Sequence, residues 1–354
     1  MKHNGLIAAL TSCFLLVVLL SAREAFGQTQ LPVPRASQKA VVSQTIGLTD
    51  VTITYHRPGV KNRKIWGDLV PYGEVWRAGA NENTTISFND PVKIESQALG
   101  EGTYGLHMIP TENEWTVIFS KNASSWGSFF YDEKEDALRV KVKAQPAEHQ
   151  EWLSYQVDEL TSSSGIVSLR WEKLNVPIKI DLDRHNIVLT HARDEYLRGP
   201  AGFSWQGWNQ AANYCLQNNI NLEEAVTWAD KSISMSEQFA NLQTKAGLLE
   251  KIGKTADARP LKDRSMKIAN EADINNLGYQ HLSANRTKEA IDLFKKNVKA
   301  YPDSWNVYDS LGEAYEKNGD MKLAVENYSQ ALKRVKDEQN KKRITQTLNR
   351  LQTK

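Results

Sequence analysis

The spacing of apolar residues changes near residue 183, and this change most limits what the chain can fold into. Before it, apolar and polar residues alternate, as Val51, Ile53 and Tyr55 do with their polar neighbours. Beyond it, apolar residues recur at the three- and four-residue spacing of helices. The sequence therefore predicts a multidomain protein, with an antiparallel all-β domain over residues 34–182 followed by an all-α part.

Short turn signals divide the first part into about nine alternating runs. The turns are Arg57-Pro58-Gly59, Asn89-Asp90-Pro91, Gly100-Glu101-Gly102 and Ser162-Ser163-Ser164-Gly165. Many short strands separated in this way are typical both of sandwiches and of closed barrels. The alternation does not distinguish the two, so we expect an all-β sandwich or barrel.

The second part repeats itself. Four polar turns, NINLEEA, IGKTADA, ANRTKEA and NGDMKLA, each close on an alanine. These alanines are Ala225, Ala258, Ala290 and Ala324, at spacings of 33, 32 and 34 residues. The period and the small residues resemble tetratricopeptide repeats over residues 205–338. The resemblance implies paired helices stacked in a solenoid, an architecture used for protein recognition.

Helical segments are expected on both sides of the repeats. Residues 183–204 are predicted to form a helical linker, because helical spacing over Arg184 to Arg198 ends at Gly199-Pro200. Residues 339–354 are predicted to form a capping helix, with Ile344, Leu348 and Leu351 on one face.

The N-terminus has the pattern of a secretory signal peptide. Met1-Lys2-His3 gives a basic start, Leu6 to Leu20 is mostly apolar, and Ala25-Phe26-Gly27 offers a cleavage site. We therefore expect residues 1–27 to be removed, leaving a periplasmic or secreted protein with no stable membrane span. Cleavage would leave Cys215 alone, and its apolar helical context indicates a buried, inert thiol.

Charge and motifs bound the possible functions. The net charge of +2 gives no reason to expect binding to nucleic acid. The sequence lacks the Gly-x-Ser-x-Gly elbow, the His-Glu-x-x-His motif and the Walker phosphate loop. Cys215, the one cysteine expected after signal cleavage, cannot by itself build a Cys-rich zinc site. We expect no metal and no cofactor, and a binding protein is favoured over an enzyme.

The densest polar stretch of the β part runs from His56 to Asn83 and combines cations with aromatic residues. Arginine supplies forked donors and tryptophan a stacking face, which suits a small anionic or sugar-like ligand. The candidate ligand-binding residues of this stretch are His56, Arg57, Arg63, Trp66, Arg77, Asn81 and Glu82. The alternative is a self-bracing loop, whose arginines donate to its own carbonyl groups.

His107 is a further candidate, on a later strand where it shares a face with Thr103, Gly105 and Ile109. If the strands that carry His56 and His107 are neighbours, the two histidines and Glu82 would form a metal or acid–base cluster.

Two long strings in the β part resemble a known family. They are TYHRPGVKNRKIWGDLVPYGEVWRAGANENTTISF and LGEGTYGLHMIPTENEWTVIFSK. With the residues that precede them, they resemble the exported bacterial family called domain of unknown function twenty-nine eleven, over roughly Pro34 to Leu182. The resemblance implies an all-β exported domain and carries no known activity or catalytic residue.

Together these observations favour a non-catalytic binding or scaffolding protein of the periplasm or cell surface. A protein or peptide partner would bind in the repeat groove, and the β domain would hold a small ligand. The alternative is an envelope hydrolase acting on sugars or peptides, with Arg77, Asn81 and Glu82 orienting the substrate and a histidine as acid or base.

Overall fold

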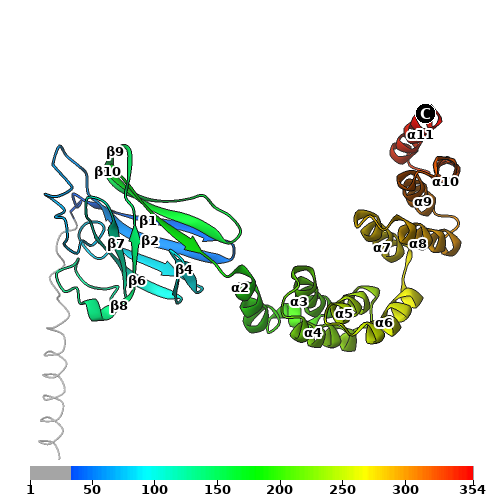
Figure 1. Cartoon of the computed structure of the whole chain (residues 1–354), viewed down its shortest axis with the longest axis horizontal. Coiled ribbons are helices and arrows are strands. Elements are labelled where there is room, and N and C mark those ends of the chain that lie inside the picture. The colour runs from blue at the N-terminus through cyan, green and yellow to red at the C-terminus, as the bar shows by residue number, and fades with distance from the viewer. Residues whose placement is uncertain (1–32, 354) are drawn as a thin grey trace, which may run out of the picture. The chain divides into compact units, whose positions relative to one another are not determined.

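The computed structural model describes residues 33–353, so the predicted signal peptide, residues 1–27, lies outside the described residues. The chain divides into two compact units, with the boundary between Arg184 and His185. The first unit consists of β-sheets and the second of helices (Figure 1). Between residues 33 and 353, no helix has the length and apolar character needed to cross a bilayer.

The strands of the first unit pair antiparallel in two sheets. Within the described residues they are β1 (Gln38–Ile46), β2 (Thr49–Arg57), β3 (Thr85–Phe88), β4 (Val92–Ile94), β5 (Gln97–Leu99), β6 (Gly102–Ile109), β7 (Trp115–Ser120), β8 (Asp136–Val142), β9 (Gln145–Asp158) and β10 (Ser164–Asp181). One sheet has the order β1-β2-β3-β6-β7-β8, and the other has the order β5-β4-β10-β9. These ten strands exceed the expected nine, because β4 and β5 have three residues each and are too short to show alternation.

Alternation decides which face of each sheet is buried. In β2, Val51, Ile53 and Tyr55 are at most 2% exposed, and Thr52 and Thr54 lie on the opposite face. The second sheet buries residues such as Leu169 and Ile178. Because the two sheets are separate, the unit is an antiparallel sandwich. This confirms the all-β prediction and answers the question of sandwich or barrel.

Four tryptophans pack together inside the sandwich unit. Trp66 lies with its ring centroid 4.9 Å from that of Trp115 and 5.6 Å from that of Trp171, and Trp76 stacks on Trp171 at 5.9 Å. Trp76 also exchanges two backbone hydrogen bonds with Met108, each of 2.8 Å. Aromatic contacts of this kind stabilise beyond the area they bury. They attach the long loop between β2 and β3 to the core.

The second unit is built from helix pairs. Its helices are α2 (Arg184–His191), α3 (Trp205–Asn218), α4 (Leu222–Met235), α5 (Phe239–Lys251), α6 (Thr255–Ile268), α7 (Glu271–Ser283), α8 (Thr287–Ala300), α9 (Trp305–Asn318), α10 (Met321–Arg334) and α11 (Glu338–Gln352). A π-helical turn follows α2 over Ala192–Tyr196. The pairs α3–α4, α5–α6, α7–α8 and α9–α10 reproduce the predicted tetratricopeptide-like solenoid.

The repeated alanines lie where the helices of each pair approach each other. Ala225, Ala258, Ala290 and Ala324 are near the start of α4, α6, α8 and α10, and all four are fully buried. A methyl group is the largest side chain that such a close approach accommodates. The period read from the sequence therefore reports the contact within each helix pair.

A second repeated position lies seven residues after each alanine, and it is polar in the first three pairs and Ala331 in the fourth. Ser232 donates to the Trp205 carbonyl at 2.8 Å, and Asn297 donates to the Glu271 carbonyl at 3.0 Å. Ser265 accepts from Gln243 at 2.6 Å. Each of these fully buried side chains therefore joins the second helix of its pair to the first.

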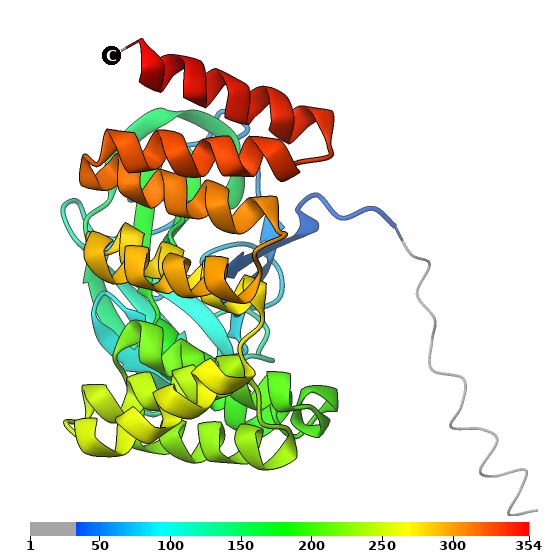
Figure 2. The same ribbon diagram turned by 90° about the vertical axis from the view of Figure 1, so that its right-hand side faces the viewer.

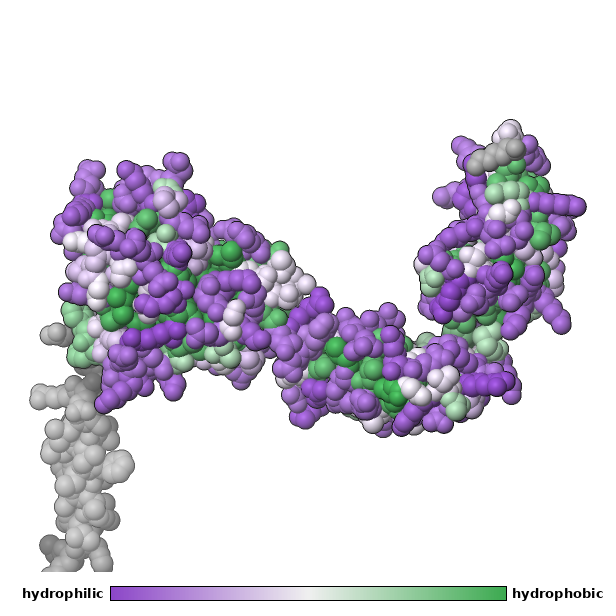
Figure 3. Space-filling view, in the orientation of Figure 1, coloured by the Kyte–Doolittle hydropathy of each residue, from purple (hydrophilic) through white to green (hydrophobic). Residues whose placement is uncertain are grey.

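The C-terminal helix α11 covers the last pair. Its residues Ile344, Leu348 and Leu351 are buried in the same core as Phe294 and Tyr328. Figure 2 shows α9, α10 and α11 side by side. On the face in view in Figure 3, the surface of the helices is mostly hydrophilic, with apolar patches between the polar residues.

We predict that Gly278→Ala destabilises the helical unit. A methyl group on Gly278 would lie 2.4 Å from Cε1 of Phe294, whereas one on Gly312 would lie 3.1 Å from the Tyr328 ring. In an uncrowded helix, alanine is favoured over glycine by about 1 kcal/mol. At Gly278, overpacking should make alanine unfavourable instead, and the free energy of unfolding should fall by about 1–3 kcal/mol.

The measurement is the thermal unfolding of the full chain, followed by circular dichroism at 222 nm. Gly312→Ala is the matched control, and its loss should be smaller than that of Gly278→Ala. A rise in Tm for Gly278→Ala would contradict the packing described for α7 and α8.

Candidate functional site

The turn that follows Trp76 is held in an unusual backbone conformation. Ala78 has φ of 49° and Asn81 has φ of 60°, both in the left-handed region. For alanine this conformation costs roughly 1–2 kcal/mol. The Ala78 carbonyl accepts hydrogen bonds from Tyr155 Oη at 2.9 Å and from Thr84 Oγ1 at 3.2 Å. These two buried donors offset the cost, and the turn presents Asn81 and Glu82 from a fixed backbone.

Three of the predicted ligand-binding residues stabilise the loop itself. Arg57 donates through Nε to the Leu153 carbonyl at 2.8 Å. Arg63 donates through Nη2 to the Gly59 carbonyl at 2.6 Å. Trp66 lies in the tryptophan cluster. Arg63 therefore braces its own loop, Arg57 attaches the end of β2 to β9, and Trp66 anchors the loop in the core.

Arg77 is directed into the protein rather than toward solvent. A methyl group on Gly127 would lie 3.0 Å from Cδ of Arg77, so the side chain packs against this glycine. Its Nε is buried and has no hydrogen-bond partner in the described part of the chain. Burial lowers the pKa of the guanidinium below its usual value. No contact joins Arg77 to Glu82 among the hydrogen bonds and ion pairs of residues 33–353.

Glu82 is the centre of a small charged group. Arg35 Nη1 donates to both carboxylate oxygens of Glu82, at 2.6 and 2.8 Å, and His56 Nε2 lies 3.3 Å from Oε2. The hydrogen bonds from Arg35 lower the pKa of Glu82. Burial lowers the pKa of His56, although Glu82 acts in the opposite direction. At neutral pH the group is therefore an ion pair with a neutral imidazole.

Arg35 was not among the predicted residues. It precedes β1, where no alternation or motif marks a functional position. Asn81 fastens the same segment, because its Nδ2 donates to the Ser37 carbonyl at 3.0 Å. The segment and the turn border a cavity of about 630 Å³, here called the Glu82 cavity. It is lined by Pro34, Arg35, Ser37, Gln38, Lys39, Thr54, His56, Glu82, Asn83 and Thr85.

His107 does not join this group, because its strand β6 is not a neighbour of β2, which carries His56, and the condition for a cluster of the two histidines is not met. Strand β3 lies between β2 and β6. His107 Nδ1 instead pairs with Ser128 Oγ at 2.9 Å, and its ring lies against Tyr131. Burial lowers its pKa to about 4. Within the described residues, no three metal-ligating side chains are grouped to hold an ion.

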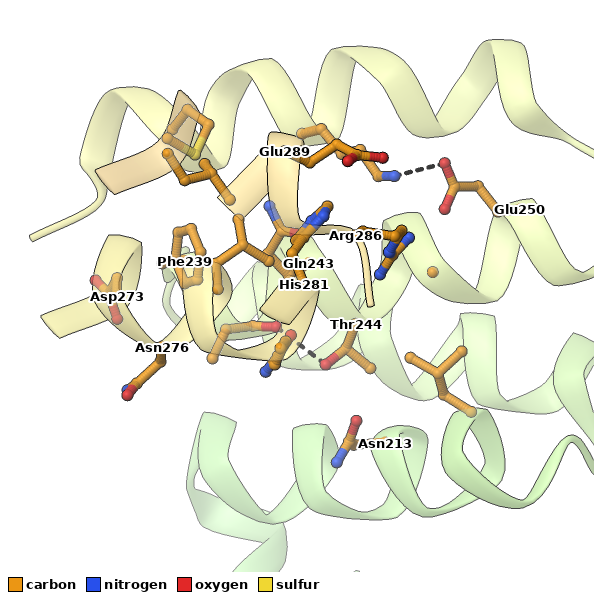
Figure 4. Close-up of a pocket in the computed structure, with 18 of the residues that line it drawn as sticks. Asn213, Phe239, Gln243, Thr244, Glu250, Asp273, Asn276, His281, Arg286 and Glu289 are labelled. Carbon is orange, nitrogen blue, oxygen red and sulfur yellow. Dashed lines mark hydrogen bonds and ion pairs between the residues drawn. The ribbon is translucent and has the colours of Figure 1, made fainter. Parts of the chain in front are cut away.

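A second candidate site lies in the helical unit. A groove of about 780 Å³ is bordered by α3, α5, α6, α7 and α8, and we call it the helical groove. Six amide side chains line it: Asn209, Asn213, Gln217, Gln243, Asn276 and Gln280. They come from the first helices of three successive pairs, as Asn213, Gln243 and Asn276 illustrate (Figure 4). No sequence motif marked them, because each is a single polar residue on an exposed or partly exposed part of its helix.

Two polar atoms in the lining of the helical groove lack partners. Asn209 Oδ1 and His281 Nδ1 are buried, and neither has a hydrogen bond within residues 33–353. The charges are nearly balanced, and one pair is closed by Lys262 Nζ on Glu250 Oε1 at 2.5 Å. The groove therefore offers hydrogen-bonding groups more than net charge.

A family model matches most of the sandwich unit. Residues 37–180 match the family described as "Protein of unknown function (DUF2911)", which confirms the resemblance of the β part. No curated protein matches the chain.

Several solved structures match the chain at low identity and low TM-score. One is MamA from Desulfovibrio magneticus RS-1, with 18% identity and a TM-score of 0.28 over 44% of this chain and 85% of that one. Another is YrrB, described as a TPR protein with an unusual peptide-binding site, with 15% identity and a TM-score of 0.28 over 46% and 83%. A third is pilF of Pseudomonas aeruginosa, with 16% identity and a TM-score of 0.29 over 43% and 69%.

We predict that His107 makes the sandwich unit sensitive to acid. Its pKa is lowered from 6.5 to about 4 by burial, so the unfolded state binds a proton before the folded state does. The contribution of neutral His107 to the free energy of unfolding is therefore complete above pH 6.5, and it is lost as the pH falls toward 4. The free energy of unfolding should decrease by roughly 2–3 kcal/mol between pH 7 and 4.5 through this residue.

The measurement compares Tm at pH 7 and 4.5 for the unchanged protein, for His107→Gln and for the control His149→Gln. His149 is about half exposed. The difference between the two pH values should shrink only in His107→Gln. An equal difference in all three proteins would show that other groups cause the loss.

Proposed function

We propose that this protein is an exported, non-catalytic binding protein whose helical groove holds an extended segment of a peptide partner. The observation that carries the proposal is the set of six amide side chains along the groove. Each amide has an acceptor oxygen and two N–H donors, of which Gln243 uses one on Ser265, and the backbone of an extended peptide requires both kinds of group. Export rests on the signal-peptide pattern of residues 1–27.

The spacing of the amides suits a chain that crosses several repeats. Asn213 lies on α3, Gln243 on α5, and Asn276 on α7. A peptide laid across these helices would meet one set of amides at each helix pair. Recognition through the backbone tolerates different side chains, so we expect broad sequence selectivity.

Apolar residues in the helical groove supply a place for one or two anchoring side chains. Phe239, Leu277 and Leu293 border it, and Phe239 lies near Gln243 in Figure 4. Burial of an apolar peptide side chain here would add affinity that the amides alone do not provide. The balanced charge predicts that salt weakens binding little.

The Glu82 cavity supports binding more than hydrolysis. Paired-carboxylate hydrolysis of a glycoside uses one carboxyl group as acid and a second as base or nucleophile. Among the residues that line this cavity, Glu82 is the single carboxylate, and Arg35 holds it ionised. A neutral His56 without a second acid does not complete the pair.

The test is selection from a library of unrelated 15-residue peptides by the full-length mature protein. The double variant Asn213→Ala, Asn276→Ala should bind the enriched peptides about ten- to thirty-fold more weakly, because it removes two hydrogen-bonding amides. The control is Gln346→Ala, Asn349→Ala, which removes two exposed amides from α11 outside the groove.

Methylation of the peptide's backbone nitrogens should also weaken binding, since it removes the N–H groups that donate hydrogen bonds to the amide oxygens of the groove. Failure of the full chain to enrich any peptide would overturn the proposal. So would equal affinity of the groove variant and the α11 variant.

A further inference from the structure

We propose that the sandwich unit binds a neutral oligosaccharide, with one sugar ring in the Glu82 cavity and a neighbouring ring on Trp126. Four features of the sandwich unit point to such a ligand: the polar lining of the cavity, the ion pair of Arg35 within it, an exposed tryptophan at its rim, and a fixed turn. None of these features involves the helical groove.

The lining of the Glu82 cavity matches a ligand rich in hydroxyl groups. Hydroxyls come from Thr54 and Thr85, which are paired across β2 and β3, and an amide comes from Gln38. The carboxylate of Glu82 is 39% exposed and accepts hydrogen bonds. Sugar hydroxyls both donate and accept, so mixed groups of this kind satisfy them better than a set of donors alone.

Two buried residues of the cavity retain unused hydrogen-bonding capacity. His56 and Asn83 are each 7% exposed, and both line the cavity. His56 Nδ1 and Asn83 Oδ1 have no partner among residues 33–353. Because His56 is neutral and its Nε2 faces Glu82, its Nδ1 is an acceptor, as is the amide oxygen of Asn83. Both suit hydroxyl donors, and neither suits an anion.

Of the two cationic side chains that line the cavity, Arg35 is already committed to the protein, and two further arginines of the β2–β3 stretch are committed elsewhere. Arg35 holds Glu82, while Arg57 and Arg63 donate to backbone carbonyls. In the described lining, Lys39 is the one cation without an acidic partner. An anionic ligand would have to compete with Glu82 for Arg35. A neutral ligand leaves this ion pair intact.

Trp126 supplies a face for a second ring. It is 52% exposed, and the guanidinium carbon of Arg35 lies 6.0 Å from its ring centroid. The loop that carries it is attached to the cavity, because the backbone nitrogen of Asn83 donates to the Ser125 carbonyl at 3.3 Å. The same loop exposes Phe129 and Phe130. Exposed aromatic groups of this density mark a binding surface, and their flat faces pack against the apolar faces of sugar rings.

The site is organised before a ligand arrives. The Tyr155 and Thr84 hydroxyls fix the Ala78 carbonyl, and Asn81 is attached to the Ser37 carbonyl. Glu82 and Asn83 therefore do not need to be ordered on binding. Preorganisation lowers the entropic cost of binding a flexible, weakly held ligand.

The experiment is isothermal titration of the full-length mature protein with four hexasaccharides. Three are neutral: a β-1,4-glucose hexamer, a β-1,4-N-acetylglucosamine hexamer and an α-1,4-glucose hexamer. The fourth is an anionic galacturonic acid hexamer. We expect at least one neutral hexamer to bind with a Kd in or below the millimolar range, and more tightly than the anionic one.

Two variants and one control locate the site. Trp126→Ala should weaken binding of the neutral hexamer at least ten-fold, and Thr85→Val should weaken it several-fold. Trp152→Ala is the matched control, because Trp152 is also partly exposed and also has a cation, Lys61, over its ring at 5.9 Å. Its affinity should stay within two-fold of the unchanged protein.

Absence of binding to every neutral hexamer at millimolar concentration would overturn the proposal, as would tighter binding of the anionic hexamer. Equal affinities of Trp126→Ala and Trp152→Ala would also overturn it. Peptide selection by the helical groove is unaffected by these variants, so the two proposals fail or succeed separately.

Discussion

A pair of buried tyrosines joins the two sheets of the sandwich to its long loop, and the geometry of the Glu82 cavity depends on it. Tyr55 on β2 and Tyr155 on β9 have ring centroids 4.8 Å apart. The Tyr155 amide donates to Tyr55 Oη at 3.2 Å, and Tyr155 Oη donates to the Ala78 carbonyl. In this buried setting, a lost partner would leave a polar group without hydration. The positions of Asn81 and Glu82 therefore follow from the contact between the sheets.

Local patterns predicted the two folds because each pattern records burial of side chains at a regular interval. Val51, Ile53 and Tyr55 were readable as core residues in this way. The partner of a buried hydroxyl was not readable, since the hydrogen bond between Tyr155 and Tyr55 joins residues 100 positions apart. Arg35 could not be identified as a site residue for the same reason, because its ion pair with Glu82 joins residues 47 positions apart. Periodicity carries no information about which distant loops meet.

One position of the second helix pair differs from the last two pairs, and it lines the helical groove. Phe294 and Tyr328 occupy the position four residues after the repeated alanine, where each packs against a glycine of the preceding helix. In the second pair that position is Lys262, which pairs with Glu250 and lines the helical groove. A charged residue at this position does not pack in the core as Phe294 and Tyr328 do, and it lines the groove with a polar side chain instead. The departure from the repeat pattern at Lys262 thus coincides with the helical groove.

The cationic stretch from His56 to Asn83 shows why the density of charge in a sequence does not identify a ligand. Between β2 and β3 the chain has few strand partners, so its carbonyl groups need other donors. Arg63 fills that need at Gly59 and Val60, while Arg57 donates to the Leu153 carbonyl of β9, and each is thereby removed from the surface available to a ligand. What the loop leaves for binding is a neutral imidazole, an ion pair that cancels its own charge, and hydroxyl groups. A sequence rich in arginine has in this way produced a cavity better suited to an uncharged molecule.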